Sequence, residues 1–473
     1  MKKFFKIKEN GSSVKTEVIA GFSTFMTMAY IIALNPNLLT NFDTGSALWN
    51  AVFLATVLSA GVGTIVMAFL ANKPFVMAPG MGLNSFFAVV VTNIVTITGL
   101  TYTESFNAAM CIILLEGVVF IVLSLLNVRE KIVKAIPLGV RLGIAPAIGL
   151  MLLNIGLGSN AGIYTETGGP FYMLSDFFGG LTPSVTRDAM GANGYNTMVL
   201  YVITTFVGLF LIVALAHKKV TGAVLIGMLG SSVVYWIGSF ILGNNPFAAL
   251  KDASWVPPFK DMAETTLFKF NFSGLLEIGW ISVIMLVVTF CMIDMFDTIG
   301  TLVGTASRAN MLDQDGNMPK MKEALLSDAI GTTVGACTGT STVTTFVESA
   351  AGVEAGGRTG LTALTSGILF LACVFIAPIA ALVPAPATSA ALIYVGILML
   401  SGLKNIDFDD MTQVLPVALM LIAMPISGSI GHGIGLALIA YTIIMLLTGK
   451  AKKVSVLTYV LSALFLVKFF LVV

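Results

Sequence analysis

The stretch ISVIMLVVTFCMIDMFDTIGTLVGT, residues 281–305, places two carboxylates inside an apolar segment long enough to cross a membrane. Thirteen uncharged residues precede Asp294, and Asp297 follows three positions later. At that spacing both side chains project from one face of a helix. A lone buried acid is often a structural group paired with an arginine, but two acids on one face favour a functional site. The stretch therefore predicts a membrane protein whose site lies on this helix.

Composition supports the same class. The chain has 473 residues, of which 57% are hydrophobic and 10% charged, and its mean hydropathy is +0.95. Soluble domains carry about 25% charged residues. The net charge of +1 argues against nucleic acid as a partner. The four cysteines stand singly and the two histidines lack a second ligand at metal spacing, so no metal site is predicted.

Hydropathy predicts an all-α polytopic membrane protein with fourteen spans. They lie near residues 17–38, 48–70, 74–95, 104–126, 134–156, 196–216, 221–242, 276–305, 322–339, 341–356, 360–383, 386–402, 408–428 and 430–448. A further apolar segment at 454–472 either spans the membrane or lies along its surface.

Basic residues gather in alternate connections, as the positive-inside rule requires. The connections predicted to be cytoplasmic lie at Lys73, 127–134 (NVREKIVK), 217–219 (HKK), 308–322, Arg358, Lys404 and 450–453. This pattern places the N-terminus in the cytoplasm.

Seven predicted spans precede residue 250 and seven follow it, so the two halves have opposite orientations. This arrangement is typical of inverted-repeat transporters, whose binding sites are marked by interrupted spans at matching positions. The third span of each half is interrupted: KPFVMAPGMGLNSFF (73–87) carries two Pro and two Gly, and GTSTVTTFVESAAG (339–352) is rich in β-branched and small polar residues. The alternative is that Pro and Gly simply kink these helices; the positional match favours a site.

These interrupted segments contain Asn84 and Glu348. An Asn offers a donor pair and an acceptor, and a Glu offers acceptors or, when protonated, a donor. Together with Asp294 they suit a flat, neutral ligand bearing N–H groups and ring nitrogens. Half-helices that begin at the breaks add free backbone N–H groups.

The motifs MAPGMGLNSFF, IDMFDTIGTLVGTASRANMLDQDG and LLSDAIGTTVGACTGTSTVTTFVESAAGVEAGGRTGLTAL resemble the nucleobase–cation symporter-2 family, in particular its hypoxanthine/guanine/adenine permease branch. The likeness runs from KTEVIAGFSTFMTMAY to the LLTGK near residue 450. It implies fourteen spans in two inverted repeats of seven, with a short strand and a half-helix in each of spans 3 and 10. It also implies proton-coupled purine uptake, and no enzymatic activity.

The resemblance assigns substrate contacts to Asn84 in span 3, Asp294 in span 8 and Glu348 in span 10. Leu83 and Val347, beside the break points, would offer backbone groups to the base. Asp294, Glu348 and the second acid of span 8, Asp297, are the expected proton-coupling groups. The proton is the coupling ion, and no other cofactor is expected.

The resemblance also implies two domains. A core domain covers 14–127 and 276–383, a gate domain covers 128–242 and 386–449, and an extra apolar segment covers 454–473. Family members are commonly dimers, so we expect a homodimer through the gate domain. The expected location is the cytoplasmic membrane, where lipid surrounds a multi-pass chain with a cytoplasmic N-terminus.

Hypoxanthine or guanine is the expected substrate, because the whole-chain likeness is strongest there. Adenine is the main alternative, since one carboxyl group serves either hydrogen-bonding pattern by changing its protonation. The residues depart from the uracil and xanthine/urate branches. An anion transporter of similar architecture is disfavoured because its site should be basic or free of carboxylates, whereas three acids, Asp294, Asp297 and Glu348, line the predicted site. An intramembrane aspartyl protease is disfavoured because the two Asp residues of such a protease come from separate helices, whereas Asp294 and Asp297 share one.

Other charged residues have structural interpretations. Glu116, in CIILLEGVVF, and Arg141, in PLGVRLGIAP, are predicted to form a charge pair that holds core against gate. The alternative places Glu116 on the proton route. Glu323 and Asp328 are predicted to be acids at the N-terminus of the ninth span.

Overall fold

Nearly all of the chain that the structure describes is helical. The computed structural model describes residues 4–126, 129, 136–158, 161, 181, 183–250, 254–308, 311, 318–427 and 429–471. Within these residues, ten helices are long and apolar enough to cross a membrane. The protein is therefore a multi-pass membrane protein, as its composition predicts.

The first part of the chain supplies one strand and eight helices among the described residues, together with a short 3-10 turn. These elements are α1 (Val14–Met28), α2 (Ile31–Leu39), α3 (Ala47–Leu70), β1 (Met77–Pro79), α4 (Met81–Thr98), α5 (Tyr102–Leu125), α7 (Leu138–Gly156), α9 (Pro183–His217), α10 (Ala223–Ile241) and η2 (Ala248–Leu250).

The second part begins with two short helices and then repeats the long-helix pattern. Its described elements are α11 (Phe259–Thr265), α12 (Phe272–Leu276), α13 (Trp280–Arg308), α14 (Met321–Thr338), β2 (Val343–Thr345), α15 (Ser349–Glu354), α16 (Gly360–Ala372), η3 (Cys373–Phe375), α17 (Ala377–Ala380), α18 (Ala385–Leu400), η4 (Ser401–Asn405), α19 (Met411–Ser427), α20 (Ile430–Leu447), η5 (Ala451–Lys453) and α21 (Val456–Leu471).

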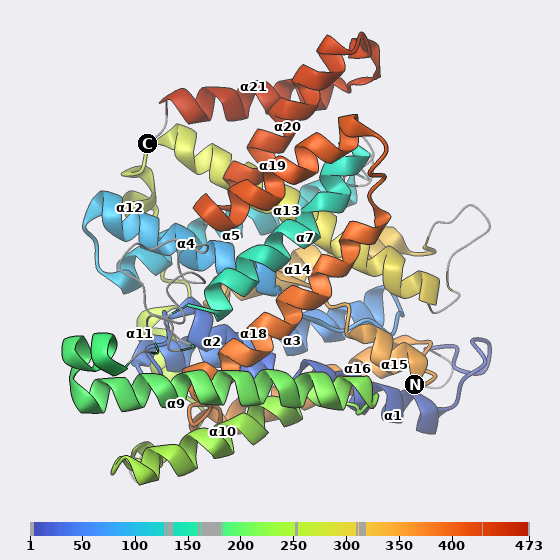
Figure 1. Ribbon diagram of the computed structural model, residues 1–473. Coiled ribbons are helices and arrows are strands. Elements are labelled where there is room, and N and C mark those ends of the chain that lie inside the picture. Colours follow the sequence, from blue (N-terminus) through green and yellow to red (C-terminus); the bar gives the residue numbers. More distant parts are fainter. Residues whose placement is uncertain are drawn as a thin grey trace.

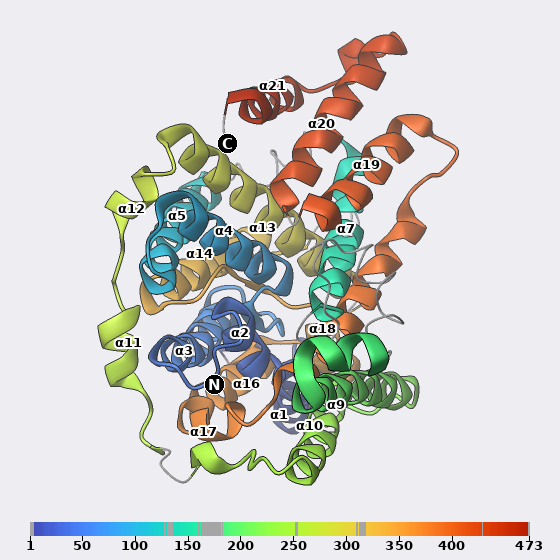
Figure 2. The same cartoon turned by 60° about the vertical axis from the view of Figure 1, so that its left-hand side comes forward.

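The long helices pack in two groups. In one group α3 packs against α14 and α16, and α5 packs against α14. In the other, α7 packs against α18 and α19, α19 against α20, and α9 against α10 and α18. In Figure 1, helices α7 and α18 of the second group lie in front of the first group, and in the turned view of Figure 2 they lie to the right of α3, α5 and α14. Segments far apart in the sequence are neighbours within each group.

Two short strands meet between helices that lie far apart in the sequence. Strands β1 and β2 pair antiparallel, with Ala78 opposite Thr344. Outside the strands, Gly80 N–H donates to the Thr342 carbonyl at 3.0 Å. Proline favours extended backbone at Ala78, the residue before Pro79, and a β-branched run favours it in β2. All six strand residues are buried, which permits non-helical backbone at membrane depth. The predicted strands in these two segments are confirmed.

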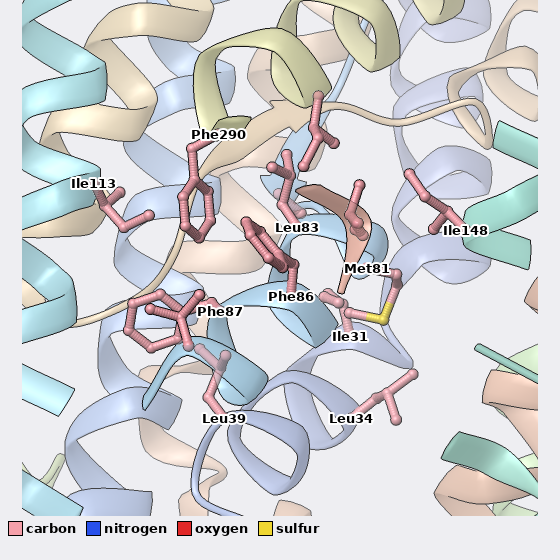
Figure 3. Packing of buried hydrophobic residues seen from close by; sticks show 14 of the residues in the cluster. Ile31, Leu34, Leu39, Met81, Leu83, Phe86, Phe87, Ile113, Ile148 and Phe290 are labelled. Atoms are coloured by element: carbon pink, nitrogen blue, oxygen red, sulfur yellow. The ribbon is translucent and has the colours of Figure 1, made fainter. Parts of the chain in front are cut away.

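The start of α4 is fixed by an apolar cluster. Figure 3 shows Leu83 and Phe86 among side chains from α2, α7 and α13. The rings of Phe86 and Phe290 pack with their centroids 4.7 Å apart. Leu83 is 1% exposed, so its side chain belongs to this core. The packing fixes where the helix begins relative to the strand that precedes it.

Helix α21 lies against α20, at the top of Figure 1. A 2.8 Å hydrogen bond joins the hydroxyls of Thr442 and Ser462. The helix has 16 residues, which gives a length of about 24 Å. This is less than the roughly 30 Å hydrocarbon core of a bilayer. The segment is a short apolar helix packed on the preceding one.

Candidate functional site

A cavity of about 90 Å³ lies where the two interrupted segments meet. The start of α4 and the end of β2 form part of its wall, and α13, α18 and the break between α1 and α2 complete it. The lining residues are Tyr30, Gly80, Met81, Gly82, Asp297, Thr301, Thr345, Phe346, Val347, Glu348, Val395 and Met399.

Glu348 is held in this wall by a tyrosine from the other half of the chain. Its carboxyl oxygen Oε1 accepts a 2.9 Å hydrogen bond from the hydroxyl of Tyr30. Glu348 is also the N-cap residue of α15. Val347, immediately before it, is 53% exposed and lines the same cavity. One oxygen of the carboxyl group is thus positioned by Tyr30, and the group still borders the cavity.

Two further polar side chains in the wall have no partner among the described residues. Asp297 forms neither a hydrogen bond nor an ion pair with any residue that the structure describes, although it lies on the membrane helix α13. The hydroxyl of Thr345 is buried and makes no hydrogen bond within the same set. Buried polar groups are normally hydrogen-bonded, so these two groups are available to a polar ligand or to water.

The start of α4 brings backbone N–H groups to the cavity. Gly80 is the N-cap of this helix, and Met81 and Gly82 follow it in the wall. The first N–H groups of a helix have no intrahelical acceptor. A Cβ on Gly80 would lie 2.6 Å from Cγ2 of Thr344 in the facing strand. Glycine is therefore required for the strand and the helix start to approach this closely.

Asn84 and Leu83 do not line the cavity. The amide nitrogen of Asn84 donates to Asn35 Oδ1 at 2.6 Å, and its amide oxygen accepts a hydrogen bond from the Ser341 hydroxyl. Asn35 in turn donates to Thr340 Oγ1 at 2.9 Å. In this conformation Asn84 ties the two interrupted segments together from behind the wall.

Asp294 also lies outside the cavity, in a buried cluster of charged groups. Arg129 Nη2 is 3.5 Å from Asp294 Oδ2 and 3.0 Å from Asp328 Oδ2. Thr298 Oγ1 lies 3.0 Å from Asp294 Oδ1 and 2.7 Å from Thr344 Oγ1. Neighbouring residues of a strand point to opposite faces. Thr344 therefore faces this cluster and Thr345 faces the cavity, so β2 separates the two.

The predicted charge pair between Glu116 and Arg141 is wrong. Glu116 is fully buried and its Oε2 accepts a 2.6 Å hydrogen bond from the Thr342 hydroxyl. Arg141 lines a different cavity, on the first turn of α7, and its Nε has no hydrogen-bond partner among the described residues. The prediction failed because Arg129, which the hydropathy pattern assigned to a cytoplasmic connection, supplies the buried positive charge.

Asp328 is not a helix N-terminal acid. Helix α14 begins at Met321, so Asp328 lies beyond its first turn, where it is fully buried and paired with Arg129. Glu323 does lie in the first turn, as predicted. Acids inside a membrane protein are usually paired with a cation, whatever their distance from a helix end. Asp328 is therefore buried beside Arg129 and does not lie at the helix terminus.

The sequence did not identify Tyr30 or Arg129 as parts of the site and its supporting cluster. Arg129 is 1% exposed and its guanidinium lies 3.8 Å from the centre of the Phe120 ring. The one available signal was a shortage of positive charge near three intramembrane acids. Tyr30 carried no signal, because a tyrosine near the end of an apolar span is commonplace. No group of three or more potential metal ligands occurs among the described residues.

The family profile described as Permease family, Xan_ur_permease, matches residues 15–430. The chain belongs to the nucleobase–cation symporter-2 family. It is therefore a transporter, not an enzyme. The resemblance inferred from the sequence motifs is confirmed.

Two relatives of this permease match it over nearly their full lengths. The guanine/hypoxanthine permease PbuO of Bacillus subtilis is 35% identical, covering 99% of this chain and 100% of the relative. The adenine permease AdeP of Escherichia coli is 35% identical, covering 99% of this chain and 95% of the relative. The equal identities do not separate the two substrate classes.

Solved structures of more distant transporters share the fold of this permease. The transmembrane domain of the cyanobacterial bicarbonate transporter BicA aligns with a TM-score of 0.62 at 16% identity, covering 89% of this chain and 96% of that domain. The murine anion transporter Slc26a9 in its inward-facing state aligns with a TM-score of 0.61 at 12% identity, covering 92% and 68%.

Proposed function

We propose that this permease carries purine nucleobases, chiefly hypoxanthine and guanine, inward across the cytoplasmic membrane together with a proton. The observation that carries the proposal is the cavity at the two interrupted segments. It brings together Glu348, positioned by Tyr30, and two polar side chains that have no partner in the described part of the chain, Asp297 and Thr345. The full-length kinship with permeases named for purine bases supports this substrate class.

These groups suit the polar edge of a neutral purine. A carboxylate accepts hydrogen bonds from ring N–H groups, and a hydroxyl or a backbone N–H donates to ring nitrogens and carbonyl oxygens. Met81, Val347 and Met399 supply apolar surface for the ring faces. Ligand sites commonly combine mostly apolar walls with a few placed polar groups.

Asn84, Asp294 and Leu83 act behind the cavity wall in this proposal. Asn84 links the interrupted segments, Asp294 belongs to the Arg129 cluster, and Leu83 anchors the start of α4. Glu348, Val347 and Asp297 contact the base or its proton directly. Any contact made by Asn84 or Asp294 then belongs to another conformation in the transport cycle.

The proposed architecture is fourteen spans in two inverted repeats, with a cytoplasmic N-terminus. The antiparallel pairing of β1 with β2 supports it, because matching segments of inverted repeats meet in opposite directions. The two helix groups support a core domain at 14–127 and 276–383 and a gate domain at 128–242 and 386–449. We further propose that copies associate through the gate domain, where α9 and α10 are largely exposed.

In this scheme, base transport is coupled to proton transport because the two facing states of the permease bind the base and the proton with different affinities. A proton taken up from outside neutralises one acid, Asp297 or Glu348, and lowers the cost of placing a neutral base beside two carboxyl groups. The loaded core then moves against the gate, and base and proton leave inside. Transport in one direction requires that the two facing states bind the pair with different affinities.

Uptake of labelled bases by cells that express this permease tests the proposal. Hypoxanthine uptake should rise as the outside pH falls and should collapse with a protonophore. A competition panel of adenine, guanine, xanthine and uracil should show guanine as the strongest competitor. Uptake indifferent to pH and protonophore would remove proton coupling, and inhibition by adenine alone would reassign the substrate.

Anion transport is the second candidate, and only the fold favours it. The structures that share the fold are a bicarbonate transporter and an anion transporter. The cavity of this permease instead contains two carboxyl groups, Asp297 and Glu348, which repel an anion. Uptake of labelled bicarbonate by the same cells would decide between the two functions.

A further inference from the structure

A second cavity adjoins the first one. It has a volume of about 220 Å³ and lies between the middle of α13, the first turns of α7 and the 3-10 turn η4. Asp297 and Thr301 line both cavities. The two spaces therefore meet at the same turn of α13, and the second is the larger.

The second cavity lies on the side predicted to be cytoplasmic. Its wall includes Gly402 and Asn405 of η4, next to the exposed basic residue Lys404. The chain just before α7 is one of the basic connections that place the inner face. A base moving along α13 from the first cavity toward this face would enter this space.

Of the described residues that line this second cavity, Arg141 is the one cation. Its Nε is buried without a hydrogen-bond partner, and the side chain forms no ion pair with any residue in the described part of the chain. A guanidinium has five N–H donors and no acceptor. A buried donor left without a partner is costly, so this group is suited to a ligand that brings acceptors.

The other polar groups of this wall complement a guanidinium. Asp297 offers a carboxylate, Asn405 an amide and Thr301 a hydroxyl, and Phe296 adds an aromatic ring. Arginine makes two parallel hydrogen bonds to adjacent acceptors such as O6 and N7 of an oxopurine. Adenine has a donor in place of O6, so it matches the same fork less well.

We propose that the second cavity is an inner binding station for the transported base, in which Arg141 donates to the O6/N7 edge of hypoxanthine or guanine. This inference rests on the proposed function. The base is passed between the two stations beside Asp297, which borders both. Arg141 thereby recognises the base on its way to the cytoplasm, after it has left Glu348.

The test uses hypoxanthine and 7-deazahypoxanthine, which has C–H in place of the N7 acceptor. Both compounds are applied to the inner and, separately, to the outer face of vesicles carrying the full chain, as inhibitors of labelled hypoxanthine exchange. A hydrogen bond from a charged donor corresponds to about a tenfold or greater change in affinity. In the wild type, we expect 7-deazahypoxanthine to inhibit at the inner face more weakly than hypoxanthine does, by about that factor. In R141Q this preference should disappear at the inner face and persist at the outer face.

The matched control is K404Q, which removes one positive charge at the same end of the protein. Lys404 itself lies outside the cavity wall. The K404Q variant should keep the wild-type preference at both faces. If R141Q fails to reach the membrane, R141K replaces it, because lysine keeps the charge but loses the two-pronged geometry; its inner-face preference should also fall.

Three outcomes overturn the inner station. One is an unchanged inner-face preference in R141Q or in its replacement R141K. Another is loss of the preference at both faces, which would place Arg141 at the first cavity. The third is loss of the preference in K404Q, which would indicate a general effect of charge. A wild type that exchanges no purine at all would instead overturn the proposed function.

Discussion

The hydroxyl of Tyr30 donates a 2.9 Å hydrogen bond to Oε1 of Glu348, across 318 positions of sequence. Both residues lie at interruptions of a span: Tyr30 between α1 and α2, and Glu348 between β2 and α15. The candidate site is thus assembled from both halves of the chain. A residue at an interruption can present both a side chain and free backbone groups to a ligand, which a residue inside a regular helix cannot.

Replacing Glu348 by Gln should weaken base binding by about ten- to a hundredfold. The change keeps the volume of the side chain but removes a charged acceptor, whose hydrogen bond to a base contributes roughly 1.5–3 kcal/mol. Glu348→Asp shortens the reach by one methylene and should harm transport nearly as much. Binding titrations on purified protein measure the effect.

Both Glu348 variants should still reach the membrane, because Gln costs less to bury than an ionised Glu. Surface expression therefore serves as the control for the binding experiment. Wild-type affinity in Glu348→Gln would remove this residue from the site and leave Asp297 and Thr345 as the polar groups facing the base.

Asp297→Asn should separate binding from accumulation. Asn keeps the shape and an acceptor oxygen at a position that borders both cavities, but it does not titrate. We expect equilibrium affinity for the base to change by less than about tenfold, while accumulation against a gradient is lost. Binding and uptake should be compared in the same vesicles. Full accumulation in this variant would assign the proton to another acid.

Gly82→Ala should wedge the start of α4 against α7. A Cβ on Gly82 would lie 2.7 Å from Cγ2 of Ile148, one of the residues labelled in Figure 3. Overpacking of this kind typically costs about 1–3 kcal/mol. The variant should therefore lower the midpoint of thermal unfolding and slow transport.

Combining Gly82→Ala with Ile148→Ala provides the control, because the second change removes the obstructing methyl group. The pair should be less destabilised than the sum of the single variants, by about 1 kcal/mol or more. Ile148→Val should give little relief, since valine keeps a branched Cβ. Strict additivity of the two alanine variants would show that the contact has no energetic role.

Arg129→Met should be strongly destabilising. Arg129 is the cation paired with Asp294 and Asp328, and both acids are fully buried. Removing one partner of a buried ion pair typically costs about 3–5 kcal/mol, because the remaining charge is left uncompensated. The measurement is thermal unfolding of the purified protein, with membrane expression recorded alongside.

Adding Asp328→Asn to Arg129→Met should recover part of the lost stability, because it removes one of the unpaired charges. The single variant Asp328→Asn serves as the reference for this comparison. If the double variant proved less stable than Arg129→Met, the proposed charge compensation in the cluster would be incorrect.

The sequence by itself determined the class of the protein and the places where its helices are interrupted. In a chain with so few charges, apolar runs of about 20 residues form membrane-spanning helices, because in lipid every backbone hydrogen bond must be made within the segment itself. Pro79, Gly80 and the β-branched run of β2 act locally, through backbone sterics, so their effect is readable without any partner. Motif similarity over the whole chain added the family.

Only the tertiary structure decided which acids face a cavity and which face a cation. Asp294 and Asp297 are one turn apart on α13, yet the first lies in the Arg129 cluster and the second borders both cavities. The spacing of residues along a helix determines which face a side chain projects from. The neighbours of that side chain depend on which other segments pack against the face. Arg129 and Tyr30 lie far in sequence from the acids that they contact, and Arg141 lies far in sequence from Asp297, with which it lines a cavity. Such groups are brought together by three-dimensional packing, which sequence separation does not encode.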